Sequence, residues 1–344
     1  EQTRAAESAC QPATCAEGSG GRRIRVRSDR CLPQDAPRRT RRSMAKAADV
    51  ALVTEARYVQ PQPGNAYVEN IFEDDRWVAE ALERRGLSSV RVSWADTEVD
   101  WSFYRCAVLR TTWDYFERAT EFSNWLDHVQ TRTQLLNRPE LVRWNMDKHY
   151  LLDLADRGIR VVPSVFLERG VAVDLATRIQ ELGWSRGVLK PAVSGSARHT
   201  YVLDPGDIER HQSIADRLLR DEALIIQPFM PDVVERGEVT LVLFEGRVTH
   251  GVLKRPKPGD FRVQDDHGGT VHPHTASPEE IAFAESTLAV LDETPLYGRV
   301  DLVRDPAGRL AVMELELVEP ELWFRMHPPA ADRFAAGLAG RLRP

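Results

Sequence analysis

Apolar residues follow two different periods along this chain. Between residues 48 and 137, short apolar runs alternate with longer segments in which apolar residues recur every three or four positions. The short runs predict strands, and the longer segments predict helices that bury one face. We expect strands at residues 50–53, 90–94, 106–110 and 135–136, and helices at residues 71–85 and 116–129. Strands that alternate with helices are typical of a parallel sheet, so the sequence predicts an α/β fold class here.

A helical pattern with a charged start follows at residues 144–156. Met146, Tyr150 and Leu154 recur at helical spacing, and Gly158 is expected to end the helix before a strand at residues 159–162. This pattern places Lys148 in the first turn of the helix, where the helix dipole opposes a cation. The lysine is therefore either solvated or bound to an anion.

A second lysine lies at the end of a predicted strand. The apolar run at residues 187–191 contains Lys190, and Ser194-Gly195-Ser196 follows as a turn of small residues. Backbone N–H groups in such a turn can approach phosphate oxygens, although the sequence of a Walker loop is absent. A further strand at residues 224–229 leads into a linker, as expected for a hinge that binds a nucleotide base between two lobes.

Three acidic residues near the end of the chain are predicted to share one face of a sheet. In an extended strand Glu314 and Glu316 project to the same side, because alternate side chains share a face. Asp301 lies in another strand pattern, and a turn at residues 305–308 would pair the two strands. Clustered carboxylates repel one another unless cations neutralise them, and hard oxygen ligands favour Mg²⁺ or Mn²⁺. The alternative is a solvated polar face.

Arg110 and Trp113 follow the third strand of the parallel region. Ligands of parallel sheets bind beyond the carboxyl ends of the strands. An arginine for a carboxylate and an aromatic ring for an apolar body suit a small acidic or amino-acid-like substrate. The alternative is that Trp113 packs in the core.

Composition narrows the class of protein further. A chain of 344 residues with 42% hydrophobic content can bury a sizeable core, and its length suggests two or three domains. No apolar run reaches 18 residues, so we expect no membrane span and a cytoplasmic protein. Three of the four cysteines precede residue 44, and Cys106 alone lies in a patterned segment, so no disulfide framework is expected.

Residues 1–43 differ from the rest of the chain. They hold ten arginines and five acidic residues, show no sustained period, and leave 36 basic and 47 acidic residues in the remainder. We therefore expect residues 1–43 to be a disordered tail or a non-native extension, with Met44 as the biological start. The acidic body argues against nucleic acid as the main partner. The sequence leaves open whether the protein forms a homo-oligomer.

The order of these motifs resembles that of the ATP-grasp superfamily, from Val50 to the end of the sequence. Within the superfamily, the chain looks most like the glutathione-synthetase and RimK-like branch, and especially the cycloserine-forming ligases. The matching positions are Asp147-Lys148, Leu189-Lys190-Pro191, Ser194-Gly195-Ser196, Gln227-Pro228-Phe229, Gly237-Glu238, Lys254, Phe261-Arg262, Gly268-Gly269, Asp301, Glu314 and Glu316.

The resemblance implies a fold and a role for each matching residue. It implies an N-terminal domain at residues 44–137, a nucleotide-binding lid at 138–226 and a catalytic lobe at 227–344, with ATP held between the last two. Relatives commonly have Asn at the position of Glu316. The implied groups are ATP contacts at Lys148, Lys190, Ser194, Gly195, Ser196, Gln227, Phe229 and Glu238; catalytic cations at Lys254 and Arg262; metal ligands at Asp301, Glu314 and Glu316; and substrate contacts at Arg110, Trp113, Arg299 and Glu319.

The activity implied by the resemblance is ATP-dependent ligation of a carboxylate to an amine. ATP would convert a small amino-acid-like carboxylate to an acyl phosphate, which the amine then attacks, and positioned cations suffice for the phosphoryl transfer. The products would be a dipeptide or a γ-glutamyl amide, in specialised metabolism. Two alternatives stay open: a ligase that closes a ring within one substrate, and an ATP-binding protein or kinase that does not ligate.

Overall fold

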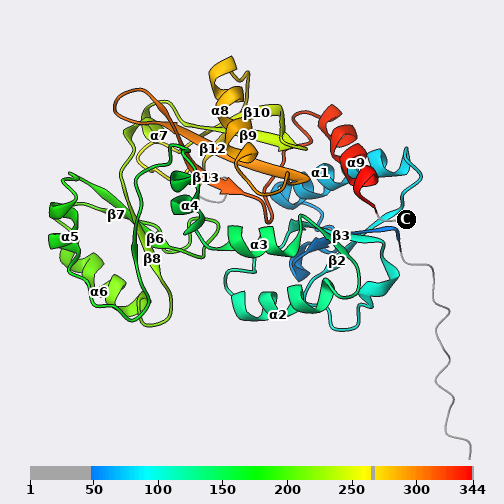
Figure 1. Ribbon diagram of the computed structural model, residues 1–344, viewed down its shortest axis with the longest axis horizontal. Coiled ribbons are helices and arrows are strands. Elements are labelled where there is room, and N and C mark those ends of the chain that lie inside the picture. The colour runs from blue at the N-terminus through cyan, green and yellow to red at the C-terminus, as the bar shows by residue number, and fades with distance from the viewer. Residues whose placement is uncertain (1–47, 265–267, 343–344) are drawn as a thin grey trace, which may run out of the picture. The chain divides into compact units, whose positions relative to one another are not determined.

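The fold contains three β-sheets, and each carries its own set of helices. The computed structural model describes residues 48–264 and 268–342, so the expected tail at residues 1–43 lies outside the described residues. Figure 1 shows the three sheets along the chain, from the parallel sheet in blue and cyan to the last sheet in yellow and orange. The α/β class predicted from the sequence is confirmed.

The first sheet is parallel, as the alternating periods predict. Its strands run in the order β2-β1-β3-β4. Apolar residues on its two faces belong to two different cores, one shared with α2 and one shared with α1 and the last helix of the chain. The elements are β1 (Val50–Thr54), α1 (Ala66–Glu83), β2 (Ser89–Ser93), β3 (Cys106–Thr111), α2 (Ala119–Val129) and β4 (Gln134–Leu136), with short 3₁₀ turns at Ala56–Tyr58 and Trp101–Phe103.

The second sheet is antiparallel and has a core of its own. Its strands run in the order β5-β8-β6-β7, and two helices cover one face. This sheet and its two helices therefore share a core separate from those of the other sheets. The elements are β5 (Val165–Leu167), α5 (Leu175–Glu181), β6 (Gly187–Pro191), β7 (Tyr201–Leu203), α6 (Ile208–Leu218) and β8 (Leu224–Pro228).

The third sheet is also antiparallel, in the order β11-β10-β9-β12-β13. Three helices pack against its apolar face, and two of them precede the second sheet in sequence. The strands are β9 (Glu238–Phe244), β10 (Arg247–Arg255), β11 (Thr270–His274), β12 (Tyr297–Arg304) and β13 (Leu310–Glu316), and the helices are α3 (Pro139–Met146), α4 (Tyr150–Asp156) and α8 (Pro278–Ala289). The remaining helices are α7 (Pro231–Glu235) and α9 (Pro329–Arg341), and α9 lies beside α1.

Two local predictions are wrong. Lys148 does not lie in the first turn of a helix, because α3 ends at Met146 and α4 begins at Tyr150. The backbone turns between them, and the Lys148 amide donates a hydrogen bond to the carbonyl of Ala192, 2.9 Å away, instead of joining a helix. Residues 159–162 are not a strand either, since only Val161 forms an isolated bridge, to Val312.

Strand β9 shows how one strand serves two purposes. Leu241 and Leu243 point into the core beneath the helices, as expected for alternate residues of a strand. On the opposite face, Glu238 and Thr240 are polar, whereas Val242 and Phe244 join the core shared with the first sheet. The polar half of this face therefore faces a site, and the apolar half attaches the third sheet to the first.

Buried hydrogen bonds reinforce that attachment. The Asn137 side chain donates to the carbonyls of Tyr297 and Leu317, at 2.9 and 2.8 Å, and accepts from the backbone amide of Leu296. The Tyr297 hydroxyl donates to carbonyls on both sides of the junction, Leu109 and Val318. Buried polar groups that satisfy one another across a junction are costly to separate. Among the described residues, no helix is both long and apolar enough to cross a membrane.

Candidate active site

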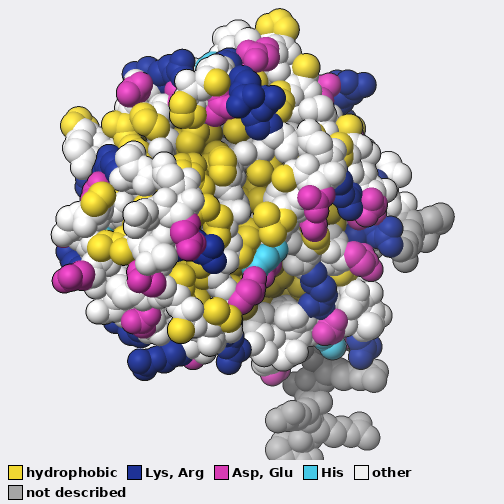
Figure 2. Space-filling model, turned by 60° about the vertical axis from the view of Figure 1, so that its left-hand side comes forward, with side chains coloured by type: hydrophobic (Ala, Val, Ile, Leu, Met, Phe, Trp, Pro, Cys, Tyr) yellow, Lys and Arg dark blue, Asp and Glu magenta, His cyan; other side chains and the backbone are white. Residues whose placement is uncertain are grey.

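A cavity of about 230 Å³ lies where the third sheet, the second sheet and the loop after β3 meet. Figure 2 shows hydrophobic side chains gathered along the middle of one face, with charged side chains mainly around them. All but one of the sequence-predicted site residues line the cavity, and the exception is Arg110. Those lining it are Lys148, Lys190, Ser194, Gly195, Ser196, Gln227, Phe229, Glu238, Lys254, Arg262, Asp301, Glu314, Glu316, Trp113, Arg299 and Glu319.

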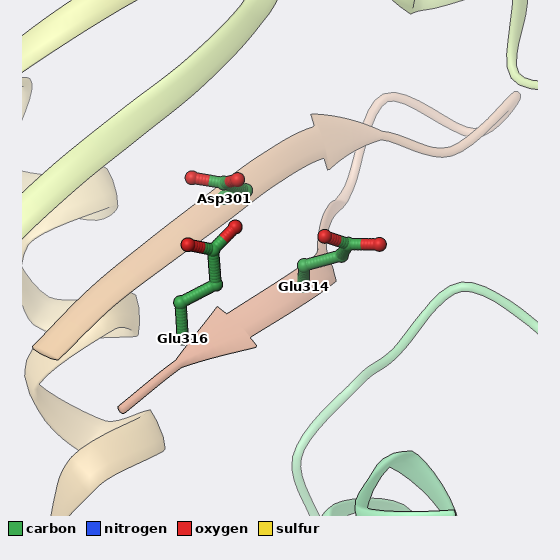
Figure 3. Close-up of side chains that lie close together, drawn as sticks. All are labelled: Asp301, Glu314 and Glu316. Atoms are coloured by element: carbon green, nitrogen blue, oxygen red, sulfur yellow. The ribbon is translucent and has the colours of Figure 1, made fainter. Parts of the chain in front are cut away.

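The three predicted metal ligands lie together on β12 and β13. The strands pair antiparallel with Asp301 opposite Glu314, so the predicted pairing across residues 305–308 is confirmed. One oxygen from each of Asp301, Glu314 and Glu316 lies within 4.8 Å of the others, and Figure 3 shows the three carboxylates on the same face of the strands. Hard oxygen donors at this spacing suit a Mg²⁺ or Mn²⁺ ion.

Asp301 is the most deeply buried of the three carboxylates and the most fully neutralised. It accepts hydrogen bonds from Thr240 at 2.8 Å, from Lys254 at 2.9 Å and from both Nε and Nη2 of Arg299. Burial opposes its charge, but the Arg299 guanidinium and the Lys254 ammonium hold the pKa of Asp301 well below its ordinary value. The carboxylate is therefore ionised at neutral pH.

Glu314 faces the two lysines that come from outside the third sheet. Lys190 Nζ donates to Glu314 at 2.7 Å, and Lys148 Nζ lies 3.9 Å from the same oxygen. Burial alone would raise the pKa of Glu314, but the two ammonium groups lower it to about 2. Burial lowers the pKa of Lys148. The pairing joins β6 of the second sheet to β13 of the third.

Glu316 has a different electrostatic environment. It pairs with Arg299, yet burial and the charges of Asp301 and Glu314 raise the pKa of Glu316 to about 7. A cation bound between these carboxylates would relieve this repulsion. Glu316 thus lies together with the other two predicted metal ligands.

Glu238 and Lys254 form the opposite wall of this cluster. Lys254 Nζ lies 2.5 Å from Glu238 and 2.9 Å from Asp301, so one ammonium joins two carboxylates. Burial opposes the charge of Lys254, but the two carboxylates raise its pKa above the ordinary value. Burial raises the pKa of Glu238. Lys254 is therefore held rigidly, as a positioned cation needs to be.

The Ser194-Gly195-Ser196 loop covers one end of the cavity. Lys148 Nζ donates to the Ser194 carbonyl at 2.8 Å, which ties the loop to the segment before α4. Ser196 and Ala197 have positive φ angles of 47° and 53°, a backbone conformation that residues other than glycine rarely adopt. Gly195 packs on Phe116, and a Cβ atom there would lie 2.7 Å from the ring. Contacts from outside the loop therefore hold it in place.

The end of β8 and the segment after it form an aromatic wall. The Gln227 amide donates to the Ser164 hydroxyl at 3.0 Å and is buried. The Arg186 guanidinium lies over the Phe229 ring, 4.3 Å from its centroid, and Phe261 approaches the same ring edge-on at 6.4 Å. Aromatic rings in this arrangement suit a planar base.

Arg262 has a partner that the sequence analysis missed. Asp260 accepts from Nε and Nη2 of Arg262 at 3.1 and 2.8 Å, and its Oδ1 also accepts from the backbone amides of Phe261 and Arg262. The bond with Arg262 and the two amides hold the pKa of Asp260 far below its ordinary value. The signal was present in the sequence, since Asp after Gly259 is typical of a side chain that caps its own turn.

Aromatic rings and carboxylates also line the cavity near Trp113 and Glu319. The Trp113 indole N–H donates to the Glu319 carbonyl at 3.0 Å, and Tyr67 and Tyr58 pack around the Trp113 ring. Glu321 accepts from Arg325 at 2.7 Å. Burial and the nearby Glu316 charge raise the pKa of Glu319 well above its ordinary value.

Arg110 does not reach this cavity. It is buried, its Nε donates to Asp75 at 2.8 Å, and its guanidinium lies over the Phe324 ring. Asp75 also pairs with Arg91, so the three side chains form a buried cluster at the carboxyl end of the first sheet. The sequence pattern correctly places Arg110 at that end, but the pairing with a residue of α1 turns it away from the cavity.

The sequence is similar to those of known proteins. Residues 50–137 match the family model described as the N-terminal domain of D-cycloserine synthetase DcsG. The chain is 33% identical over 288 residues to the cycloserine biosynthesis protein DcsG of Streptomyces lavendulae, covering 77% of this chain and 92% of that protein. It is 28% identical over 171 residues to a glutathione synthetase of Synechocystis, which covers 48% of this chain and 50% of that protein.

Solved structures extend the likeness to three dimensions. The crystal structure of D-cycloserine synthetase DcsG superposes with a TM-score of 0.73 at 30% identity, covering 86% of this chain and 99% of the other. The superposition therefore extends over most of the chain and is not confined to one sheet. The chain belongs to the ATP-grasp family of ligases, which use ATP to form carbon–nitrogen bonds, and to the group within it that contains DcsG.

Proposed function

We propose that the protein activates a small amino-acid-like carboxylate as an acyl phosphate and joins it to an amine. The observation that carries this proposal is the cluster of carboxylates on β12 and β13, surrounded by cations from three separate segments. Asp301, Glu314 and Glu316 would hold metal ions, while Lys148, Lys190 and Lys254 supply the surrounding positive charge. This is the arrangement that phosphoryl transfer requires, because charge neutralisation and positioning do most of the work.

The described residues fit ATP and Mg²⁺. The donor set is three carboxylates whose oxygens lie within 4.8 Å of one another, and carboxylate oxygens are ligands that Mg²⁺ prefers. Bound Mg²⁺ would neutralise phosphate oxygens. Lys148, Lys190 and the loop at residues 194–196 would contact the phosphates, and Gln227 and Phe229 would border the base and ribose. Glu238 would lie on the nucleotide side, beside Lys254.

The chemistry proceeds in two balanced steps. A substrate carboxylate oxygen attacks the terminal phosphorus of ATP, the bond to ADP breaks, and an acyl phosphate forms. The amine then attacks the acyl carbon, phosphate leaves, and the nitrogen loses a proton. Arg262 would stabilise the transferring phosphoryl group and the negative tetrahedral intermediate, because preorganised donors act where charge develops. The cavity walls would keep water from the acyl phosphate.

We also propose that three parts of the chain have different roles. Residues 44–137 would form the substrate side, residues 138–226 the nucleotide-binding lid, and residues 227–344 the catalytic and metal-binding lobe. The separate core of the second sheet supports a lid that moves as a unit. Trp113, Arg299 and Glu319 would face the substrate, and Arg110 would act only indirectly, through the buried cluster with Asp75.

The proposed reaction has an intermolecular and an intramolecular form, and both would use the same contacts with ATP. In the intermolecular form the product is a dipeptide or γ-glutamyl amide, and in the intramolecular form one substrate closes into a ring. The relatives named for cycloserine biosynthesis and glutathione synthesis support one form each. A protein that only binds or hydrolyses ATP would need neither Glu319 nor the aromatic wall at Trp113 in its cavity.

An ADP-release screen tests the proposal. The full chain is incubated with ATP, Mg²⁺ and pairs of D- and L-amino acids, including candidates for ring closure, and the products are identified by mass spectrometry. We expect ADP release to depend on an amino-acid-like substrate and to yield an amide in equal amount. ADP release with a phosphorylated product and no amide would identify a kinase and contradict the proposal.

A further inference from the structure

The carboxylates that line the cavity differ in one respect: whether a cation already neutralises them. Five of the six form ion pairs, and these pairs are Glu238 with Lys254, Asp301 with Lys254 and Arg299, Glu314 with Lys190, Glu316 with Arg299, and Glu321 with Arg325. Glu319 is the sixth, and it forms no ion pair within residues 48–264 and 268–342. Lys148 and Arg299 act on it only from a distance.

An ionised carboxylate at the wall of this cavity is unfavourable without a positively charged or hydrogen-bonding partner. Removal of an ion from water costs several kcal/mol unless an opposite charge or hydrogen bonds compensate it. The Glu319 backbone is fixed by the Trp113 indole, 3.0 Å from its carbonyl, and Pro320 follows directly. The backbone of Glu319 is therefore held at the wall of the cavity that this residue lines.

The surroundings of Glu319 identify the kind of ligand that would neutralise it. An ionised Glu319 would repel an anionic group. A metal ion is not indicated, because the only group of three potential ligands among the described residues is Asp301, Glu314 and Glu316. The cavity that Glu319 lines also has an aromatic wall: the Trp113 and Tyr67 ring centroids lie 6.0 Å apart, the Trp113 indole N–H donates to the Glu319 carbonyl, and Tyr115 lines the same cavity. A carboxylate in a cavity with an aromatic lining suits an ammonium group.

We infer that Glu319 binds the positively charged amino group of the substrate, with Trp113 and Tyr67 forming the wall beside it. This inference rests on the proposed ligase function and narrows it, because it requires a substrate with a free primary ammonium group. A hydroxy acid or a simple dicarboxylic acid of the same size would lack the cation. The role also explains why this carboxylate, unlike its neighbours, has no cation within the protein.

The test compares Glu319→Gln with a matched control, Glu321→Gln. Glu321 lines the same cavity but is already neutralised by Arg325, so its substitution should change the substrate KM less than threefold. Glu319→Gln keeps the shape and should raise the KM for the amino substrate roughly ten- to a hundredfold, the usual value of a hydrogen bond to a charged group. The KM for ATP should stay unchanged.

A binding measurement makes the test independent of turnover. Calorimetry with a nonhydrolysable ATP analogue and Mg²⁺ compares amino acids that release ADP with the 2-hydroxy acids of the same skeleton. The wild-type chain should prefer the amino acid by at least tenfold, and Glu319→Gln should lose that preference. If no amino acid releases ADP, all amino acids of the screen are titrated instead.

The outcomes separate the two claims. Turnover with amino acids and an unchanged KM in Glu319→Gln would overturn the inference and leave the ligase proposal standing. Absence of ADP release with every amino acid would overturn the proposed function. In that case a lost preference for amino acids in Glu319→Gln would still support the ammonium site, whereas equal or absent binding in both chains would overturn it as well.

Discussion

The carboxylates at the two ends of the cavity differ in whether cations of the protein pair with them. At the end where we propose a metal ion, the metal end, Asp301, Glu314 and Glu316 lie close to one another, and each forms an ion pair with a cation from β6, β10 or β12. At the end where we propose the substrate, the substrate end, Glu319 has no ion pair among the described residues. The carboxylates of the metal end are therefore each paired within the protein, although they still repel one another, whereas Glu319 needs a ligand to pair with its charge. A general nucleotide chemistry and a selective substrate site can thus occupy one cavity.

The largest expected effect comes from the metal end. Glu314→Gln removes a ligand charge while it keeps the side-chain shape, and we expect ADP formation to fall by roughly a thousandfold, since a metal ion supplies several kcal/mol of charge stabilisation. Circular dichroism and thermal melting check that the variant is folded. Near-normal turnover in the folded variant would mean that the metal lies elsewhere, and the contrast between a metal end and a substrate end would be wrong.

Arg262→Ala tests the cation that we propose to face the transferred phosphoryl group. We expect turnover to fall by roughly 10²–10³, as for the loss of one preorganised donor. ATP binding, measured by calorimetry, should persist through Lys148, Lys190 and the wall at Phe229. Equal losses of ATP binding and turnover would show that Arg262 holds the nucleotide rather than the reacting group.

The segment that follows Glu319 is attached to β10 through His250, and the pH dependence of stability tests this contact. His250 Nε2 donates to the Leu322 carbonyl at 2.9 Å, the ring stacks on His327, and burial lowers the pKa of His250 to about 4. The unfolded chain takes up this proton near pH 6.5 but the folded chain does not, so the contribution of His250 to stability is lost as the pH falls from 6.5 towards 4.

His250→Gln keeps a side-chain donor and removes the titration. The free energy of unfolding of the wild-type chain should therefore fall more steeply between pH 6.5 and 4 than that of the variant, by about 3 kcal/mol in total. Denaturant titrations at several pH values measure the difference. Parallel pH profiles would show that His250 is protonated in the folded protein and that the segment after Glu319 is held by other contacts.

The smallest expected effect concerns Asp260. Asp260→Asn keeps an oxygen acceptor for the turn amides but weakens the hold on Arg262, so we expect kcat to fall about tenfold, as for a modest misplacement of a catalytic group. The KM for ATP should change little, and Asp260→Glu should restore part of the activity. A variant with normal kcat would show that the loop places Arg262 without this ion pair.

Sequence periods predicted the features that depend on neighbours along the chain. The face shared by Glu314 and Glu316 and the parallel sheet at residues 48–137 follow from local alternation, and both are confirmed. The break before Lys148 was missed, because a hydrogen bond to Ala192 competes with the helix and leaves no local signal. Likewise, Arg110 turns towards Asp75, a residue of α1 that no spacing rule connects with it.

The isolation of Glu319 could not be read from the sequence either. The sequence places Glu316, Glu319 and Glu321 within six residues, and nothing there indicates which of them will meet an arginine. Arg299 reaches one from β12, and Arg325 reaches another from four residues downstream. Which carboxylate stays without a cation is a property of the folded cavity, because it depends on how two separate segments place their guanidinium groups.

The buried side chains of Asn137 and Tyr297 have a consequence for motion. They join the first and third sheets by hydrogen bonds and a shared core, so these two sheets should rotate as one body. The second sheet, which has its own core, meets that body through the Lys190 ion pair and the contact of Gly195 with Phe116. We therefore expect nucleotide exchange to require only a swing of the second sheet, with the substrate end keeping its shape throughout the cycle.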